Sequence, residues 1–401
     1  MTTDGWIEKE LGEVLRLNYG WSLPEKKRVT GDFPVYGSNG VVGSHNKALV
    51  PAEGIVVGRK GSAGSVHLAP KPFCPIDTTF YIAPSDTSLD LEFLYFLLQH
   101  IDLKRILGDV GVPGLSREMA YKERVEFPTD RDEQRKIAGV LGLVQWVIEQ
   151  QERLLQLTTE LKKTLLHQLF TQGLRGEPQK QTEIGPVPES WEGVSVGSLV
   201  DIAHGYAFAS PHFTTSGPIV LTPGNFKLDG GLYWGDRTKF TTEKYAEEYV
   251  LHPQDLVVVM TDLTPSAKLL GTPAFIPDNK VILHNQRIGK IVLKSSKTMP
   301  EFLYWVFLTA PFKKHMAQTA TGSTVRHTSP SRIKDYKFAL PSIDEQEEMA
   351  NSLNMVDRKL QLVEVKRSAL MDLFRTLLHQ LMTAQIRVHD LDLPELNWNE
   401  Q

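Results

Sequence analysis

The sequence carries one long stretch twice. Residues 132–175 align without a gap on residues 344–387, and sixteen of the forty-four aligned positions are identical at an offset of 212. Both copies begin with Asp-Glu-Gln, and both contain Leu-Leu-His-Gln-Leu near their ends, at 165–169 and 377–381. A chain built this way has to place two equivalent elements in one fold.

A second, shorter repeat precedes each copy. Trp6 and Gly12 recur 185 residues later as Trp191 and Gly197, in the same Trp-x5-Gly spacing. The repeating unit is therefore a globular segment followed by the long stretch. The two offsets differ by 27 residues, so the second globular segment is the longer one. Similar long stretches joined to divergent globular segments indicate a constant frame that carries two different modules.

The long stretches have the periodicity of a coiled coil. In the second copy, nine of ten positions spaced alternately by four and three residues are apolar, and in the first copy seven of ten are apolar. The polar exceptions in the first copy are Gln151, Thr158 and Lys162. Each helix could cover only its own globular segment, or the two copies could pair with each other. A helix of about 40 residues is roughly 60 Å long, and this length favours pairing.

Composition bounds the class of protein. A chain of 401 residues with 41% hydrophobic residues can form two or three domains with buried cores. The single cysteine, Cys74, excludes a disulfide framework and a cysteine-rich zinc site. We expect a cytoplasmic protein without a membrane partner, because no apolar run approaches the roughly 18–20 residues of a span and the first residues lack a signal-peptide core. At a net charge of −4, any binding of nucleic acid would depend on local patches.

The globular segments contain short apolar runs broken by Gly, Pro and Asn, which is typical of strands and turns. Residues 177–190 contain three prolines and are predicted to form a linker that is neither strand nor helix. The tail echoes the end of this linker, since Pro-Glu precedes both Trp191 and Trp398. We therefore expect Trp398 to pack as Trp191 does.

Motifs in the globular segments carry a family resemblance. The first segment contains YGSNGVVGSHNKALV (36–50), GIVVGRKGSAGSVH (54–67) and PIDTTFYIAP (75–84). The second contains VVVMTDLTPSAKLLGTPAFIP (257–277) and LHNQRIGKI (283–291). With the repeated helices, these motifs make the chain resemble the specificity subunit of a Type I restriction–modification system. The resemblance covers nearly the whole chain.

The resemblance implies an α+β fold. Two mixed α/β target-recognition domains are separated by two long antiparallel coiled-coil helices, and the whole is an internal duplication with pseudo-twofold symmetry. The expected regions are recognition domain 1 (1–128), helical region 1 (129–176), the linker (177–190), recognition domain 2 (191–341), helical region 2 (342–388) and a C-terminal tail that packs near domain 1 (389–401).

The resemblance also implies a division of labour. This chain would recognise a split target on double-stranded DNA without being an enzyme and without a cofactor or metal of its own. Separate modification (methyltransferase) subunits would bind S-adenosylmethionine and methylate adenine. Restriction (motor–nuclease) subunits, which use ATP and magnesium, would attach through the modification subunits.

The motifs of an enzyme are missing from the sequence. It has neither the Asn/Asp-Pro-Pro-aromatic motif of adenine methyltransferases nor a Gly-x4-Gly-Lys-Ser/Thr phosphate loop. Two alternatives from other classes remain open. One is a stand-alone sequence-specific DNA nuclease or methyltransferase, and the other is a coiled-coil scaffold that binds no DNA.

Candidate DNA contacts are polar or basic side chains in the loops of the first recognition domain. Lys, Arg, Ser and Thr bind phosphates, while Arg, Lys, Asn and Gln read base edges. The alternative for each residue is an ordinary solvated turn. The candidates are Ser38 and Asn39 in a turn, Arg59, Lys60 and Ser62 in a glycine loop, and Ser116 and Arg117 in a later loop.

The second recognition domain offers three groups of candidates. A strand would point alternate residues outward, so at most two of residues 285–287 should face DNA. The window 311–337 is the most basic of the chain and is expected to form an edge that faces phosphates, or else a solvated face. The candidates are Thr261, Asp262 and Thr264 after an apolar strand, Asn285 and Arg287, and Lys313, Lys314, Arg326 and Arg332 in the basic window.

The identical Leu-Leu-His-Gln-Leu segments predict two equivalent docking surfaces, one for each modification subunit. The leucines could equally serve to pack one helix on another. The polar residues between them have less reason to be repeated unless they make a shared contact. We therefore assign subunit docking to His167, Gln168, His379 and Gln380.

Overall fold

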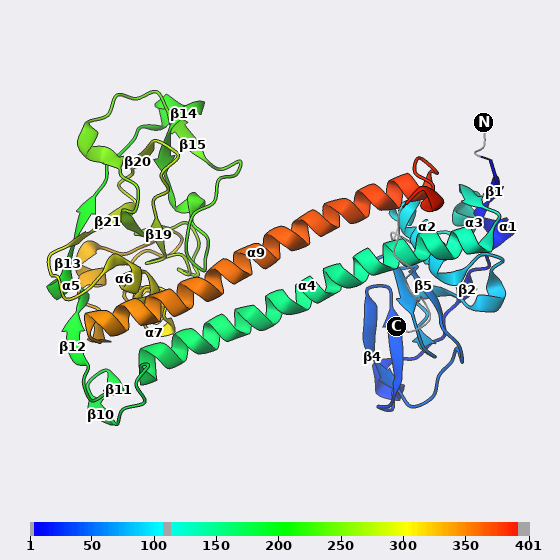
Figure 1. Ribbon diagram of the computed structural model, residues 1–401, viewed down its shortest axis with the longest axis horizontal. Coiled ribbons are helices and arrows are strands. Elements are labelled where there is room, and N and C mark those ends of the chain that lie inside the picture. Colours follow the sequence, from blue (N-terminus) through cyan, green and yellow to red (C-terminus); the bar gives the residue numbers. More distant parts are fainter. Residues whose placement is uncertain (1–3, 107–113, 392–401) are drawn as a thin grey trace. The chain divides into compact units, whose positions relative to one another are not determined.

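The computed structural model describes residues 4–106 and 114–391 (Figure 1). The chain divides into two compact units. Unit 1 comprises Met1–Arg153 and Glu364–Gln401, and unit 2 comprises Leu154–Val363. Each unit therefore combines one globular segment with parts of both long helices. In the described parts of the chain, no helix is both long and apolar enough to cross a membrane.

Two long helices account for the repeated stretches. Helix α4 spans Arg131–Gln172 and helix α9 spans Ile343–Met382. In unit 1 the beginning of α4 lies beside the end of α9, where Ile137 and Leu141 of α4 and Leu381 of α9 share one hydrophobic core. In unit 2 the end of α4 lies beside the beginning of α9. The helices run in opposite directions within each unit, which confirms the antiparallel pairing of the two copies.

Two of the three polar exceptions in the first copy have identifiable partners in unit 2. The ammonium group of Lys162 pairs with the carboxylate of Asp357 on α9 and lies 5.2 Å from the ring centroid of Trp305. The hydroxyl of Thr158 donates to the carbonyl of Leu154, one turn earlier, at 2.7 Å. The seam therefore continues through these residues with an ion pair in place of an apolar contact.

The described residues of unit 1 form three small sheets. One has the strand order β2-β8-β5-β6, one has the order β4-β3-β7, and the third pairs β1 with β9 just before α4 begins. The apolar run at 54–58 forms the fully buried central strand β5, as expected of a strand covered on both faces. The elements are β1 (Trp6–Glu10), α1 (Leu11–Val14), β2 (Asn18–Tyr19), β3 (Phe33–Gly37), β4 (Gly40–His45), β5 (Gly54–Gly58), β6 (Val66–Ala69), β7 (Cys74–Pro75), β8 (Thr79–Ile82), α2 (Leu91–His100), α3 (Arg117–Tyr121) and β9 (Arg124–Pro128).

Unit 2 repeats this plan with additions. Its first sheet has the order β13-β21-β17-β19, its second has the order β15-β14-β20-β16, and β12 pairs with β23 just before α9. The parallel pairing of β14 with β20 corresponds to that of β3 with β7. The elements are β12 (Glu192–Ser195), α5 (Val196–Leu199), β13 (Val200–His204), β14 (Phe213–Leu221), β15 (Lys239–Thr241), β16 (Val250–Leu251), β17 (Leu256–Val259), β18 (Thr261–Asp262), β19 (Pro273–Phe275), β20 (Ile282–His284), β21 (Ile288–Leu293), α6 (Pro300–Val306), α7 (Ala310–Thr319), β22 (Arg326–His327), α8 (Pro330–Lys334) and β23 (Lys337–Leu340).

The expectation of a linker without strands at 177–190 is wrong. Strand β10 (Gln179–Thr182) pairs with β11 (Gly185–Pro188) in an antiparallel hairpin. Gly185 has a positive φ of 105°, which lets the chain turn between the strands. The prolines are compatible with this hairpin because a two-stranded ribbon has outer edges that need no N–H donors.

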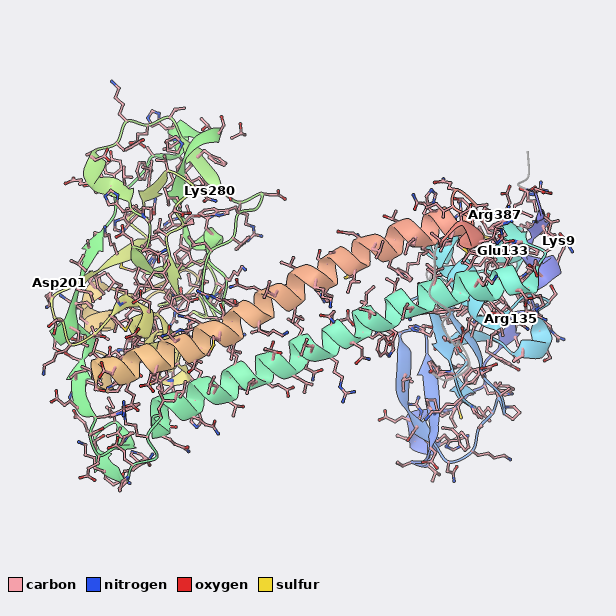
Figure 2. The ribbon with its side chains drawn as sticks, in the orientation of Figure 1. Lys9, Glu133, Arg135, Asp201, Lys280 and Arg387 are labelled. Carbon is pink, nitrogen blue, oxygen red and sulfur yellow. The ribbon has the colours of Figure 1, made fainter. Side chains whose placement is uncertain are left out.

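The glutamate of each repeated Asp-Glu-Gln triplet accepts hydrogen bonds inside its unit. In unit 1, the indole N–H of Trp6 donates to Glu133 at 3.4 Å, and Arg387 binds the same carboxylate at 2.9 and 3.1 Å (Figure 2). In unit 2, the indole of Trp191 donates to Glu345 at 3.2 Å. The repeated tryptophans and glutamates of the sequence are thus equivalent partners in the two units.

Only residues 389–391 of the predicted tail are described, so its packing near the first domain stays a prediction. Val388 is buried in the core of unit 1, and Leu391 lies against that core. Residues 392–401, with Trp398, lie outside the described residues.

Candidate nucleic-acid interface

The first turn of candidates in unit 1 is partly internal. Ser38 is 7% exposed, and its hydroxyl donates to the carbonyl of Thr78 at 2.6 Å. Asn39 is exposed and accepts a hydrogen bond from the hydroxyl of Ser62 at 3.5 Å. Ser38 therefore holds the turn, while Asn39 and Ser62 present polar groups together at the surface.

Two arginines from distant loops meet over one aromatic ring in unit 1. The guanidinium carbons of Arg59 and Arg117 lie 5.2 and 5.0 Å from the ring centroid of Tyr19. Arg59 also donates to the carbonyl of Asp77 at 2.5 Å, and Tyr19 remains 50% exposed. Cations within about 6 Å of a ring face are attracted to it, so the stack orders both guanidinium groups beside the half-exposed ring of Tyr19.

The remaining candidates of unit 1 flank this stack. Lys60 is exposed next to Arg59. Ser116 caps the short helix α3, since its hydroxyl oxygen accepts from the backbone N–H of Met119 at 3.4 Å. Tyr19 was not among the predicted contacts, and the available signal was the pair of aromatic residues on either side of Gly20.

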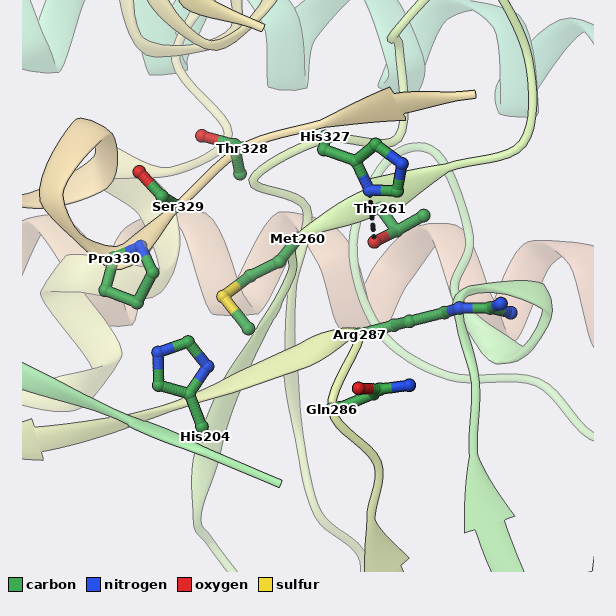
Figure 3. Close-up of a pocket in the computed structure, with 9 residues that line it drawn as sticks. All are labelled: His204, Met260, Thr261, Gln286, Arg287, His327, Thr328, Ser329 and Pro330. Atoms are coloured by element: carbon green, nitrogen blue, oxygen red, sulfur yellow. Dashed lines mark hydrogen bonds between the residues drawn. The ribbon is translucent and has the colours of Figure 1, made fainter. Parts of the chain in front are cut away.

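Unit 2 contains an open pocket of about 360 Å³ (Figure 3). Its polar side chains come from four segments that are distant in the sequence. Of the predicted candidates, Thr261 and Arg287 line it. The hydroxyl of Thr261 and Nδ1 of His327 are hydrogen-bonded at 3.2 Å. The lining residues are His204, Met260, Thr261, Gln286, Arg287, His327, Thr328, Ser329 and Pro330.

Asp262 organises a loop instead of presenting its carboxylate. It is 3% exposed, and one oxygen accepts from both the backbone N–H and the hydroxyl of Thr264 at 2.8 Å. Its other oxygen accepts from the N–H of Leu269 at 2.9 Å. Thr264 itself is exposed, so it is the outward group of this loop.

Two of the three residues at 285–287 face outward, within the expected limit of two. Asn285 is 7% exposed, and its side-chain oxygen accepts from the N–H of Arg287 at 3.1 Å. Gln286 and Arg287 are exposed at the pocket. The outward residues are adjacent instead of alternate, because the segment is a turn between β20 and β21 and not a strand.

The basic window 311–337 does not form one exposed edge, which corrects that expectation. The ammonium group of Lys313 points inward, donating to the carbonyl of Leu270 at 3.0 Å and to the hydroxyl of Thr272 at 2.5 Å. Burial lowers the pKa of Lys313 to about 8. Arg326 donates to the carbonyl of Ala317 at 3.1 Å.

The other cations of the window also differ in exposure. Arg332 donates to the hydroxyl of Thr321 at 3.3 Å, and Lys334 forms an ion pair with Asp201 at 3.2 Å. Lys314 is exposed. The number of charges in a window of sequence does not reveal such partners. A DNA contact by any residue of the window stays a prediction.

The repeated pentapeptide separates into inner and outer residues. Leu169 and Leu381 are buried in the cores of unit 2 and unit 1 respectively. His167, Gln168 and His379 are exposed, and Gln380 is partly buried. The leucines therefore pack the helices, as the alternative interpretation held, while the His and Gln side chains reach the surface in each unit.

No group of three or more His, Cys, Asp or Glu side chains within 4–106 and 114–391 is arranged to hold a metal ion. The pocket of unit 2 is instead lined by hydroxyl, imidazole, amide and guanidinium groups. Groups of this kind form hydrogen bonds with base edges and phosphates.

Known proteins resemble the chain in sequence and in structure. It is 27% identical to the Type I restriction enzyme MjaVIII specificity subunit of Methanocaldococcus jannaschii over 309 residues, which cover 76% of this chain and 72% of that one. A crystal structure of the S subunit of a Type I restriction–modification system from M. genitalium has the same fold. Its TM-score is 0.66 at 16% identity, with 95% of this chain and 99% of that one covered.

A second solved structure, from work on complex assembly and conformational transition of the type I R-M system, matches with a TM-score of 0.51. The identity is 13%, with 96% of this chain and 100% of that chain covered. The family model described as the Type I restriction modification DNA specificity domain matches twice, at residues 3–159 and 188–371. Both halves of the duplication are thus matched, and the chain belongs to the family of Type I restriction–modification DNA specificity subunits.

Proposed function

We propose that this chain recognises a two-part target on double-stranded DNA, with one half-site for each unit. The observation that carries the proposal is the double match of the DNA specificity family, once over each globular segment. Each unit also presents exposed polar side chains at one cluster of loops, around Tyr19 in unit 1 and around Arg287 in unit 2. Two different clusters on one duplicated plan suit two different half-sites.

We further propose that each unit docks one modification subunit through the end of its repeated helix. Seven identical positions are exposed in at least one copy and buried in neither, and four of them fall between 161 and 168. A solvent-facing side chain that has no packing role has little reason to recur unless it makes a shared contact. The four pairs are Leu161/Leu373, Thr164/Thr376, His167/His379 and Gln168/Gln380.

On this proposal the chain itself catalyses nothing. The modification subunits bring S-adenosylmethionine, and the restriction subunits, attached through them, bring ATP and magnesium. The purified chain should then neither methylate DNA with S-adenosylmethionine nor cut it with magnesium. Turnover by the chain alone would favour the stand-alone enzyme.

The proposed recognition is tested by selection from a randomised duplex library, using the chain bound to its cognate modification subunits. We expect two short blocks of fixed sequence separated by a spacer of fixed length and free sequence. Enrichment of one continuous block would contradict the two-part target. A library that stays random would contradict sequence recognition altogether.

A further inference from the structure

The loop clusters of the two units occupy the same place on the same backbone. In unit 1 the N–H of Trp21 donates to the carbonyl of Pro75 at 3.0 Å, and in unit 2 the N–H of Tyr206 donates to the carbonyl of His284 at 2.8 Å. Each aromatic residue forms a parallel bridge one residue further on, with Ile76 and Asn285 respectively. The pairing makes Trp21 equivalent to Tyr206.

The glycine before each aromatic residue supports this equivalence. A Cβ on Gly20 would lie 2.7 Å from the carbonyl oxygen of Pro75, and a Cβ on Gly205 would lie 2.2 Å from that of the equivalent His284. Both segments pass so close to the neighbouring backbone that only glycine fits. The residues just before the glycines, Tyr19 and His204, are therefore equivalent as well.

A second set of backbone bonds aligns the remaining loops. The N–H of Arg59 donates to the carbonyl of Thr78, and the N–H of Met260 donates to that of Arg287, both at 2.9 Å. Position 59 therefore corresponds to 260, and position 78 corresponds to 287.

The third segment follows the same pattern. The N–H of Leu115 donates to the carbonyl of Arg59, and the N–H of Thr328 donates to that of Met260, again both at 2.9 Å. The next residues, Ser116 and Ser329, each cap a short helix. The first residues of those helices, at 117 and 330, are thus equivalent.

The equivalent positions carry different chemistry. Unit 1 places cations at 59 and 117, stacked on Tyr19. Unit 2 has Met260, Pro330 and His204 at those three positions, and its pocket stays open there. Its cation is Arg287, where unit 1 has Thr78. The backbone arrangement is the same in both units, but the cations stand at different positions of it.

We propose that these four equivalent pairs are the positions that determine which bases each half-site contains, and that Arg287 in unit 2 and Arg117 in unit 1 each read a guanine. The inference rests on the proposed function and names the residues that perform it. A guanidinium group binds O6 and N7 of guanine with two hydrogen bonds, which makes arginine the commonest specific reader of that base. The pairs are Tyr19/His204, Arg59/Met260, Thr78/Arg287 and Arg117/Pro330.

The geometry favours these two arginines over the other cations of the loops. Arg287 is exposed at the pocket, and Figure 3 shows its side chain extended alongside Gln286. Arg117 is held by the ring of Tyr19, an arrangement that orders the guanidinium group without occupying its N–H donors. In contrast, Arg59 already donates to a backbone carbonyl.

The test exchanges residues between equivalent positions and repeats the library selection with the full complex. Arg287→Thr gives unit 2 the residue that unit 1 carries there. Arg117→Pro gives unit 1 the residue of unit 2, at the first position of a helix, where proline is well tolerated. Lys280→Ala is the matched control, because Lys280 is an exposed cation of unit 2 outside the pocket lining. Unchanged thermal midpoints establish that each variant is folded.

We expect Arg287→Thr to abolish the preference for guanine at one position of one half-site, a loss of roughly 5- to 150-fold in discrimination. The other half-site should keep its sequence. Arg117→Pro should do the same in the opposite half-site, and Lys280→Ala should leave both unchanged. Unaltered half-sites in the two exchange variants, or a lost preference for a base other than guanine, would overturn the inference while two-part recognition stands. A wild-type complex that selects no sequence would overturn the proposed function itself.

Discussion

In both units a buried glutamate near the start of a long helix contacts a tryptophan and an arginine, and we call these contacts the closure of the unit. The two closures use the same residue types but differ in their bonds. In unit 1, Glu133 is held by two short bonds from Arg387, whose side chain is 25% exposed. In unit 2, the equivalent Arg175 is 54% exposed and lies 3.8 Å from Glu345, which instead accepts from Trp191 at 3.2 Å and from the N–H of Leu174 at 2.9 Å. One closure depends on an ion pair, and the other on hydrogen bonds from neutral groups.

The covalent chain explains the difference. In unit 2, the hairpin β10–β11 connects the end of α4 directly to Trp191 and β12, so these pieces are already tethered. In unit 1, the end of α9 and the beginning of β1 lie almost a full chain length apart in sequence. Arg387 joins them by also donating to the carbonyl of Asp4 at 3.1 Å. Where the backbone makes no connection, a stronger side-chain contact takes its place.

The largest effect should come from removing the arginine of unit 1. Arg387→Ala leaves the carboxylate of Glu133, which is 5% exposed, without its cation, and breaking such a pair costs about 3 kcal/mol. The matched change Arg175→Ala removes a mostly exposed pair and should cost less than about 1 kcal/mol. Urea unfolding measures both free energies. Equal losses would show that the two closures do not differ as described.

The binding of modification subunits should not distinguish the two units, because the proposed docking surfaces, unlike the Glu133 and Glu345 contacts, carry the same residues in both. Leu161→Asp and Leu373→Asp each place a charge in one proposed surface and should each release one modification subunit, at a cost of about 2 kcal/mol or more per site. Native mass spectrometry would then report one modification subunit for each single variant and none for the double variant.

Leu362→Asp is the control for the docking variants, since Leu362 is 68% exposed on α9 and its counterpart in the first copy is Gln150. It should retain two modification subunits. A wild-type mass with a single modification subunit at saturation would rule out two equivalent surfaces.

Replacing the tryptophans should cost more stability in unit 2 than in unit 1, the reverse of the order expected for the arginines. Trp191→Phe removes the N–H that serves Glu345, and a hydrogen bond to a charged group contributes about 1.5–3 kcal/mol. Trp6→Phe should cost less, because Glu133 keeps both bonds from Arg387. The same unfolding experiment ranks the two variants, and a larger loss for Trp6→Phe would contradict the comparison.

The smallest effect, taken for each pH unit, should be a change in the stability of unit 2 with pH in the alkaline range. Burial lowers the pKa of Lys313 to about 8 from the ordinary 10.5, so between these values the unfolded chain binds more protons than the folded one. Stability should therefore rise with pH from about 8 to 10.5, by about 1 kcal/mol for each pH unit. Lys313→Met should flatten this rise in unfolding curves, while the exposed neighbour variant Lys314→Met should keep it. A stability that falls over this range in the wild type and in Lys313→Met alike would contradict the buried ammonium.

Much of the fold could be predicted because the two copies of the long helix still have similar sequences. The shared Asp-Glu-Gln and the apolar seam located both long helices, and the run at 54–58 has the apolar character of a buried strand. The partner of Glu133 could not be predicted, because Arg387 lies 254 residues away and only the folded chain brings them together. The hairpin at 177–190 was missed because prolines argue against a strand except at an edge.

The candidate site was predicted by residue type, and residue type does not reveal burial. Arg59, Arg117, Thr261 and Arg287 do come together in the two equivalent loop clusters. Lys313 has the same charge and nevertheless points into the protein. Tyr19 and His204 were overlooked because their roles follow from backbone pairing between distant loops, and the aromatic residues on either side of Gly20 do not by themselves reveal that pairing.

We propose that two equivalent units on one frame each recognise half of a DNA target. A map of every methylated adenine in a genome that expresses this chain with its modification subunit would test this proposal. We expect one motif made of two short fixed blocks with an unread spacer of constant length, and in the Arg287→Thr strain only one of the blocks should change. A single uninterrupted motif, or a change in both blocks together, would contradict it.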